Sequence, residues 1–281
     1  MPVLSDFKIY DANDVAGIFE LSDRREEKIY VDKKSGMKHG CIKNLYKDPV
    51  KVTEFFRQFP IVTEAISNAP GLQLYFSTDT SKVLLHVYQY LEDVLRRNKY
   101  PLGTRAVTSQ SWETYCNFHW KNMHTSVKSI LPHFDFFNYA FNIWLTEENT
   151  AGTEFFSYQF EDFDPVYYVG QFHKEHPKRF TSFFETLNVE FRDREVWDPN
   201  DKDFFKNNGF ERYLVQEPEY NSATFYPGIF FHKPVWEPGS YDPDWLRFSQ
   251  VIACAVEDGG KFQEQWYDYS NTPDFNFTED Q

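Results

Sequence analysis

The sequence has few cysteines and no long apolar run. Its three cysteines, Cys41, Cys116 and Cys254, are widely spaced and odd in number, which predicts reduced thiols and no disulfide framework. The stretch MPVLSDFKIYDANDVAG has neither a basic start nor an apolar core, so we expect no secretory signal. No apolar run approaches the length of a membrane span. We therefore expect a cytoplasmic protein that does not associate with membranes.

Positive charge is also scarce. The chain has 29 Lys and Arg residues against 43 Asp and Glu residues, a formal net charge of -14. An acidic protein repels polyanions on average, so nucleic acid is a poor candidate partner. A nucleophile elbow, a P-loop, a GxGxxG fingerprint and CxxC pairs are all absent from the sequence, which argues against the activities that these motifs support.

Aromatic residues are plentiful at 20%, and most of them are Phe and Tyr, which favour half-buried sheet. After Pro101 the chain contains many strand-like runs separated by turn residues, while a helix is expected from Lys174 to Leu187. Strands without strict β-α alternation argue against a parallel doubly wound sheet. We expect a mainly β (α+β) fold, a double-stranded jelly roll with supporting N-terminal helices. The runs are SWETYCNFHW, YAFNIWLT, GTEFFSYQF, ERYLVQ, SATFYP, GIFFHKP and RFSQVIACAV.

The first third of the chain mixes short strands with two helices. Lys34-Ser35-Gly36 predicts a hairpin turn, and Asp48-Pro49 predicts a helix start with an aspartate cap and a proline at the first helical position. That helix ends at Pro60, and apolar spacing predicts a second from Ser81 to Arg97. We expect a single domain over 1–281, with a supporting part (1–105), a jelly-roll core (106–260) and an acidic tail (261–281).

Three residues from distant segments form a candidate metal site. His133 and Asp135 are two residues apart, so on a strand both side chains point to the same side. His232 comes much later, at the end of the apolar run GIFF. Two imidazoles and one carboxylate are the set that holds non-haem iron(II) and leaves coordination positions open. Each motif also has an interpretation without a metal. A His-x-Asp sequence fits a capped turn, and a lone histidine such as His232 fits a hydrogen-bonded core or rim position.

Arg247 and Ser249 open the last apolar strand, RFSQVIACAV. A buried guanidinium is costly unless a carboxylate pairs with it. The partner of Arg247 is either an acidic residue of the chain or the carboxylate of a ligand. A planar guanidinium grips a carboxylate with two parallel hydrogen bonds, which lysine does not.

The order of these motifs resembles that of the iron(II)/2-oxoglutarate-dependent dioxygenases over roughly residues 110–256. HFD, the distal His232 and the RFS triplet carry the likeness. FNIWLTEENTAGTEFF resembles the prolyl-4-hydroxylase-like branch, and NLYKDPVKVTEFF and YNSATFYPGIFFH are similar to an uncharacterised group in that superfamily. Two departures bear on the substrate class. Arg247 stands where the prolyl hydroxylases usually use lysine, and WEPGSYDPD lengthens the segment after His232.

The resemblance implies a role for each residue. His133, Asp135 and His232 would hold iron(II), while Arg247 and Ser249 would hold the far carboxylate of 2-oxoglutarate. Tyr226 would donate its hydroxyl to this co-substrate, and Asn142 and Trp144 would line the mouth of the barrel. Ordinary packing in the barrel core is the alternative for each of these residues, and it fits Trp144 better. The implied reaction uses oxygen, with ascorbate as a candidate accessory. It converts 2-oxoglutarate to succinate and hydroxylates an unidentified substrate, either a small molecule or a protein side chain.

Two other functions fit the same sequence. The aromatic content fits a non-catalytic jelly-roll module that binds a sugar or a protein. A cupin-like enzyme would keep the metal but would not use 2-oxoglutarate. The binding module predicts no stoichiometric iron. Arg247 separates the cupin-like enzyme from the oxygenase, because a cupin-like site has no need of a buried guanidinium.

Overall fold

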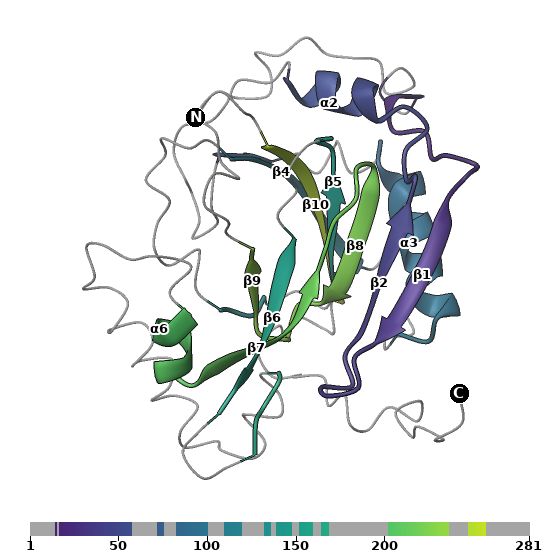
Figure 1. Ribbon diagram of the computed structural model, residues 1–281. Helices are drawn as coiled ribbons and strands as arrows, with labels where there is room; N and C mark the ends of the chain where they lie inside the picture. The colour runs from purple at the N-terminus through teal and green to yellow at the C-terminus, as the bar shows by residue number, and fades with distance from the viewer. Residues whose placement is uncertain are drawn as a thin grey trace.

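The computed structural model describes two antiparallel sheets (Figure 1). The larger has seven strands in the order β1-β2-β8-β5-β10-β4-β3, and the smaller has three in the order β7-β6-β9. The described residues are 15, 17–57, 72–75, 83–100, 110–119, 132–135, 139–147, 152–159, 164–168, 202–235 and 247–256. The strands are β1 (Glu26–Val31), β2 (Lys38–Lys43), β3 (Leu72–Tyr75), β4 (Gln110–His119), β5 (Tyr139–Trp144), β6 (Thr153–Tyr158), β7 (Phe210–Gln216), β8 (Ser222–Pro227), β9 (His232–Pro234) and β10 (Arg247–Val256).

From β4 onward the chain passes repeatedly between the two sheets. Strands β4 and β5 lie in the large sheet, β6 and β7 in the small one, β8 in the large, β9 in the small and β10 in the large. Between β4 and β5, His133 forms an antiparallel bridge to His232. The segment 132–135 therefore lies beside β9, at the edge of the small sheet.

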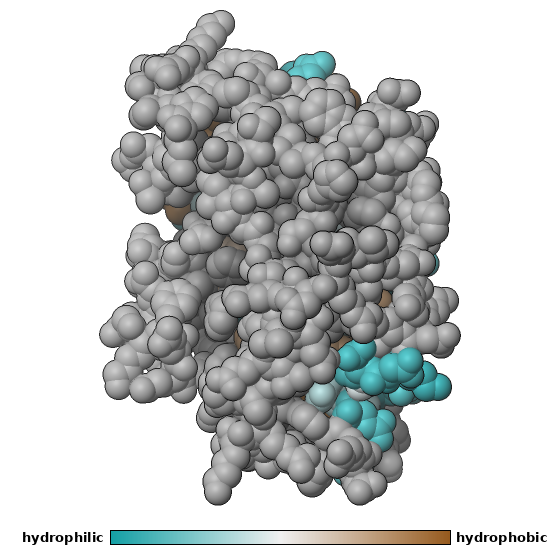
Figure 2. Space-filling view, turned by 90° about the vertical axis from the view of Figure 1, so that its left-hand side faces the viewer, coloured by the Kyte–Doolittle hydropathy of each residue, from teal (hydrophilic) through white to brown (hydrophobic). Residues whose placement is uncertain are grey.

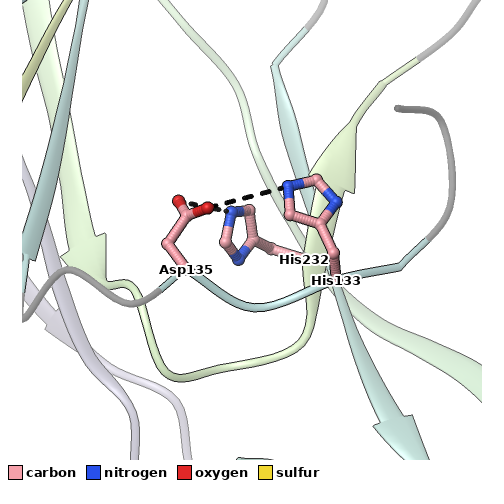
Figure 3. A group of neighbouring side chains, drawn as sticks. All are labelled: His133, Asp135 and His232. Atoms are coloured by element: carbon pink, nitrogen blue, oxygen red, sulfur yellow. Dashed lines mark ion pairs between the residues drawn. The ribbon is translucent and has the colours of Figure 1, made fainter. Parts of the chain in front are cut away.

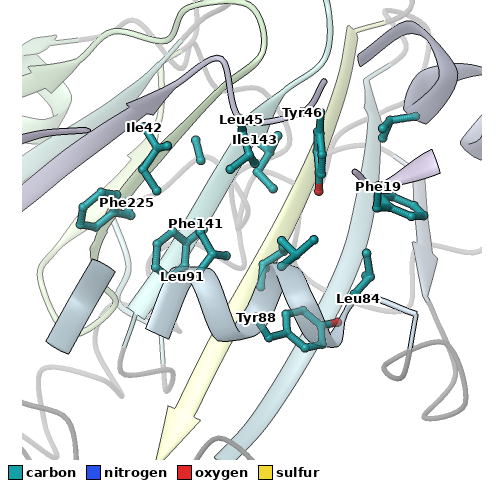
Figure 4. Packing of buried hydrophobic residues seen from close by; sticks show 14 of the residues in the cluster. Phe19, Ile42, Leu45, Tyr46, Leu84, Tyr88, Leu91, Phe141, Ile143 and Phe225 are labelled. Atoms are coloured by element: carbon teal, nitrogen blue, oxygen red, sulfur yellow. The ribbon is translucent and has the colours of Figure 1, made fainter. Parts of the chain in front are cut away.

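Helices α2 (Pro49–Arg57) and α3 (Leu85–Arg97) pack on one face of the large sheet. The Asp48 carboxylate accepts the Lys51 N–H at 3.1 Å, so the predicted cap opens α2. Figure 4 shows Leu91 of α3 beside Phe141 of the sheet, with Tyr88 and Leu84 farther along the same layer, toward Phe19. Apolar burial of this kind is the main favourable contribution to folding, at roughly 25 cal/mol per Å².

The opposite face of the large sheet turns toward the small sheet. In β5 the alternation of side chains sends Phe141 and Ile143 to the helices, and Asn142 and Trp144 to the other side. The ring of Tyr226 on β8 meets that of Phe155 on β6 edge-on, with centroids 4.9 Å apart. Side chains from the two sheets therefore contact each other in the space between them.

Most of the predicted elements that fall within the described residues are confirmed, and the chain is sheet-rich as expected. One strand prediction was wrong in part. In GIFFHKP only His232–Pro234 is a strand, because the chain turns at Pro227–Phe230, where the Phe230 N–H reaches the Pro227 carbonyl at 3.4 Å. Strand β3 and helix α6 (Lys202–Asn207) were not predicted. The helix expected over 174–187 and the acidic tail lie outside the described residues.

No helix among the described residues is long and apolar enough to cross a membrane. On the face shown in Figure 2, the residues coloured by hydropathy include a hydrophilic group near the lower edge, and the apolar ones are visible only as small patches.

Candidate metal centre

Backbone hydrogen bonds hold the segment with His133 and Asp135 against the segment that carries His232. The His133 N–H donates to the His232 carbonyl at 2.8 Å, and the His232 N–H donates to the His133 carbonyl at 2.7 Å. The Asp135 N–H donates to the Gly228 carbonyl at 2.8 Å. The two segments are thus joined by the reciprocal pair at His133 and His232 and by a third bond from Asp135 to the turn that precedes β9.

The turn between β8 and β9 sets the orientation of the His232 ring. Its Nδ1 lies 2.8 Å from the Phe230 carbonyl oxygen, two residues earlier. A carbonyl accepts only, so Nδ1 carries a hydrogen, and Nε2 is the ring nitrogen left to face Asp135. A histidine that ligates a metal usually donates its other ring N–H in this way.

The three side chains converge (Figure 3). Asp135 Oδ2 lies 3.3 Å from His232 Nε2, and Asp135 Oδ1 lies 4.0 Å from His133 Nε2. One ligand atom from each residue lies within 4.8 Å of the others, and within the described residues this is the one such group of His, Cys, Asp or Glu. These donors are the two nitrogens and one oxygen that suit a divalent transition metal such as iron(II).

The site is buried on one side and open on the other. The His232 side chain is 4% exposed, whereas those of Asp135 and His133 are 27% and 39% exposed. A metal held by all three would therefore have protein behind it and reachable positions in front. Such an arrangement suits a catalytic metal better than a fully enclosed structural one.

The electrostatics of the site favour a charged carboxylate. Burial alone would raise the pKa of Asp135, but the rings of His232 and His133 together hold it below its usual value. An ionised carboxylate beside two imidazoles is the protonation state that a metal ligand requires.

A polar group lies beside the triad on the inner faces of the two sheets. The ring of Tyr226 is 4.9 Å from that of His232, and Asn142 Nδ2 donates to the Tyr226 hydroxyl at 3.2 Å. The same Asn142 nitrogen is 3.4 Å from Thr153 Oγ1 on β6. Asn142 is partly exposed although it lies mid-strand, so solvent reaches it between the sheets. Burial, with the nearby Asp135 charge, raises the pKa of Tyr226, which keeps its hydroxyl protonated.

Ser249 and Arg247 belong to β10, which lies between β5 and β4 in the large sheet. Ser249 is buried and pairs in register with Trp144, on the face away from the helices. The backbone of Arg247 pairs with His119 on β4, and strand alternation gives Arg247 the same face as Ser249. The side chain of Arg247 lies outside the described residues. Trp144 is buried and donates its indole N–H to Thr224 at 3.0 Å, which agrees with a packing role.

Sequence reasoning missed the groups that support the ligands. The carbonyls of Gly228 and Phe230 orient Asp135 and His232, and a backbone acceptor leaves no mark in a sequence. Reasoning also missed Lys233, whose ammonium lies 2.6 Å from Glu154 in a pair that is almost fully buried. A lysine inside the apolar run FFHKPV was the available signal, because lysine is almost never buried without a partner.

Comparisons with known proteins add little. No protein-family model matches the chain, and no curated protein matches it. One solved structure that is similar is an oxidoreductase of the 2OG-Fe(II) oxygenase family from Burkholderia pseudomallei, at 12% identity and a TM-score of 0.32, covering 92% of this chain and 85% of that one. At that TM-score the likeness does not support a conclusion about function, so the function is argued from the residues of this chain.

Proposed function

We propose that the chain is an iron(II)/2-oxoglutarate-dependent oxygenase on a jelly-roll core. The observation that carries the proposal is the meeting of His133, Asp135 and His232, with His232 oriented through Nδ1 so that Nε2 faces Asp135. The repeated passage of the chain between two antiparallel sheets supports the jelly roll.

The triad has the chemistry that iron(II) requires. His133 and His232 would each offer Nε2, and Asp135 one carboxylate oxygen, while the exposed side of the group leaves room for co-substrate and oxygen. Bound iron(II) would supply the oxidative chemistry that converts 2-oxoglutarate and oxygen to succinate and carbon dioxide and hydroxylates the substrate. Zinc would fit the same donors, which is why the co-substrate site is the second part of the proposal.

The co-substrate would lie between the sheets, on the inward face of the large one. Tyr226 would donate its hydroxyl, and Ser249 and Arg247 would hold the far carboxylate. On β5, Asn142 beside Tyr226 and Trp144 beside Ser249 are two residues apart, about 7 Å along the strand. This spacing is comparable to the length of a five-carbon diacid. The substrate would approach from the exposed side of His133.

The test is the visible absorption of the protein with iron(II) and 2-oxoglutarate under anaerobic conditions. A charge-transfer band is expected for the wild type and not for His232→Ala. His86→Gln is the matched control, because His86 donates its ring N–H to the Phe19 carbonyl in the helical layer, at 2.9 Å, and its replacement should leave the band unchanged. Absence of both the band and of succinate formation in the wild type would refute the proposal.

A further inference from the structure

The residues next to the three ligands in the sequence lie on the opposite side of the backbone from the metal site. Phe134 separates His133 from Asp135, and Phe231 and Lys233 flank His232. Because neighbouring side chains on extended chain point to opposite sides, these three point away from the triad. The rings of Phe134 and Phe231 meet edge-on at 6.3 Å, so the backs of the two ligand segments contact each other.

An ion network holds the back of β9. Lys233 Nζ lies 2.6 Å from Glu154 Oε2 on β6, and Arg212 on β7 places a guanidinium nitrogen 2.6 Å from Glu154 Oε1. The side chains of Lys233 and Glu154 are only 2% and 9% exposed, while that of Arg212 is 44% exposed. The network crosses all three strands of the small sheet, from β9 through β6 to β7.

Aromatic rings cover the same network. Lys233 Nζ lies 5.4 Å from the ring centroid of Phe205 on α6 and 5.8 Å from that of Phe156 on β6. Phe156 and Phe205 are themselves 5.7 Å apart. Helix α6 thus shields the buried ammonium from water, which strengthens its attraction to Glu154.

A β-bulge brings Arg212 into this network. The register of β6 with β7 shifts between Phe155 and Phe156, so that Phe155 pairs with Leu214 and Phe156 pairs with Arg212. In a regular ladder Phe156 would face Tyr213 instead. The extra residue turns Arg212 to the outer face, where Glu154 lies, and bulges commonly redirect a side chain near an active site.

Strand β9 needs such support because it is short. It has only three residues, and the last of them, Pro234, has no N–H to donate to the ladder. Its first residue, His232, is the ligand with the least exposed side chain of the three. A rotation of β9 about its own axis would move His232 Nε2 away from Asp135.

We infer that Lys233, Glu154 and Arg212 are positioning residues, whose buried ion network sets the orientation of β9 and hence the place of His232 in the metal site. The inference rests on the proposed metal site. A buried ion pair can often be replaced by apolar residues with no loss of stability. A buried pair directly behind a ligand is therefore better explained by the geometry that it imposes on β9 than by a gain in stability.

The experiment compares the double variant Lys233→Met/Glu154→Leu with the wild type, using Co(II) alone as the probe. The unfolding midpoint without metal should be equal or higher, whereas the dissociation constant for Co(II) should rise 10–100-fold, the usual effect of losing support behind a metal ligand. The visible ligand-field bands of Co(II) should also change. A purely structural network would leave affinity and bands unchanged once the midpoint is preserved.

Two further variants make the result decisive. Glu92→Leu/Arg96→Met removes a pair of similar chemistry on α3, with a 5% exposed Glu92 side chain, and should bind Co(II) as the wild type does. If the first double variant does not fold, Glu154→Gln keeps the volume and should still weaken Co(II) binding. Folded variants of the network that bind within twofold of the wild type would overturn this inference alone. A wild type that binds no Co(II) would overturn the metal site and this inference together.

Discussion

His133 and His232 are joined by their own backbones. Each donates its amide N–H to the carbonyl of the other, at 2.8 and 2.7 Å, and their ring centroids are 4.7 Å apart. Residues paired in this way send their side chains to the same side, so the pairing itself brings two imidazoles together. Their surroundings nevertheless differ, since the His232 side chain is 4% exposed and that of His133 is 39% exposed.

This difference predicts unequal effects of alanine at the two positions. Both His133→Ala and His232→Ala should abolish tight binding of Mn(II). In the presence of a chelator, His232→Ala should also lower the free energy of unfolding by about 1–3 kcal/mol, because it leaves a cavity and removes the hydrogen bond from the His232 ring to the Phe230 carbonyl, whereas His133→Ala should stay within about 0.5 kcal/mol of the wild type. Urea unfolding and Mn(II) titration measure the two quantities. Equal losses of stability would contradict the burial of His232.

Arg247 should affect the co-substrate and not the metal. Arg247→Ala should weaken binding of 2-oxoglutarate by about 2 kcal/mol or more, because it would remove the guanidinium proposed to pair with the far carboxylate. Arg247→Lys should be intermediate, since lysine keeps the charge but lacks the planar fork. Titration of the iron(II) form with 2-oxoglutarate gives the affinities, and Arg97→Ala, at a half-exposed pair with Glu27, is the control. Unchanged affinity in Arg247→Ala would favour a cupin-like site.

The Tyr226 hydroxyl should contribute a smaller amount. Tyr226→Phe removes the group that receives the Asn142 N–H at 3.2 Å and would donate to the co-substrate. We expect 2-oxoglutarate to bind about fivefold more weakly, which corresponds to one hydrogen bond of about 1 kcal/mol. Tyr46→Phe is the matched control, because it removes a buried hydroxyl that donates to Gln250 at 2.6 Å in the layer shared with the helices. Equal effects of both variants on 2-oxoglutarate binding would count against a role for Tyr226.

Stability should fall in mild acid because of His39. Burial lowers the pKa of His39 from 6.5 to about 4, although the Asp32 charge works against it. Protonation of His39 therefore favours the unfolded chain. The contribution of the neutral ring to the free energy of unfolding is complete above pH 6.5 and is lost as the pH falls toward 4. Between pH 7.5 and pH 5 this residue alone should cost about 2 kcal/mol.

The matching variant is His39→Gln, which cannot titrate. Urea unfolding at several pH values should show a shallower loss of stability in the variant than in the wild type over this range. The neighbouring Gln216 amide, 3.4 Å from His39 Nδ1, provides a polar partner in both proteins. Identical pH slopes would mean that His39 is not the group that titrates.

Local pattern was sufficient where a strand has a regular apolar sequence and clear ends. SATFYP and RFSQVIACAV were predicted with the bounds that β8 and β10 have, because turn residues or charge flank each run. Helix α2 was predicted from Asp48-Pro49 for the same reason, since its cap is a local interaction. Helix α6 was missed because KDFFKN is too short to show helical periodicity.

The candidate site was predictable only as a set of residue types. The sequence around His133 and His232 does not predict that their backbones pair. That pairing depends on the turn at Pro227–Phe230, where the apolar run GIFF had predicted a strand. The support from Lys233 and Glu154 was beyond reach for a similar reason. It depends on the register of β6 with β9, which pairs these two residues across distant parts of the chain.

The most direct measurement is a crystal structure of the protein with Mn(II) in place of iron and an inert mimic of 2-oxoglutarate. The expected result is a single Mn(II) bound by Nε2 of His133, Nε2 of His232 and a carboxylate oxygen of Asp135, with the far carboxylate of the mimic on Arg247 and Ser249. A structure in which Mn(II) is absent from these three side chains under saturating conditions, or is bound elsewhere in the chain, would contradict the proposed oxygenase.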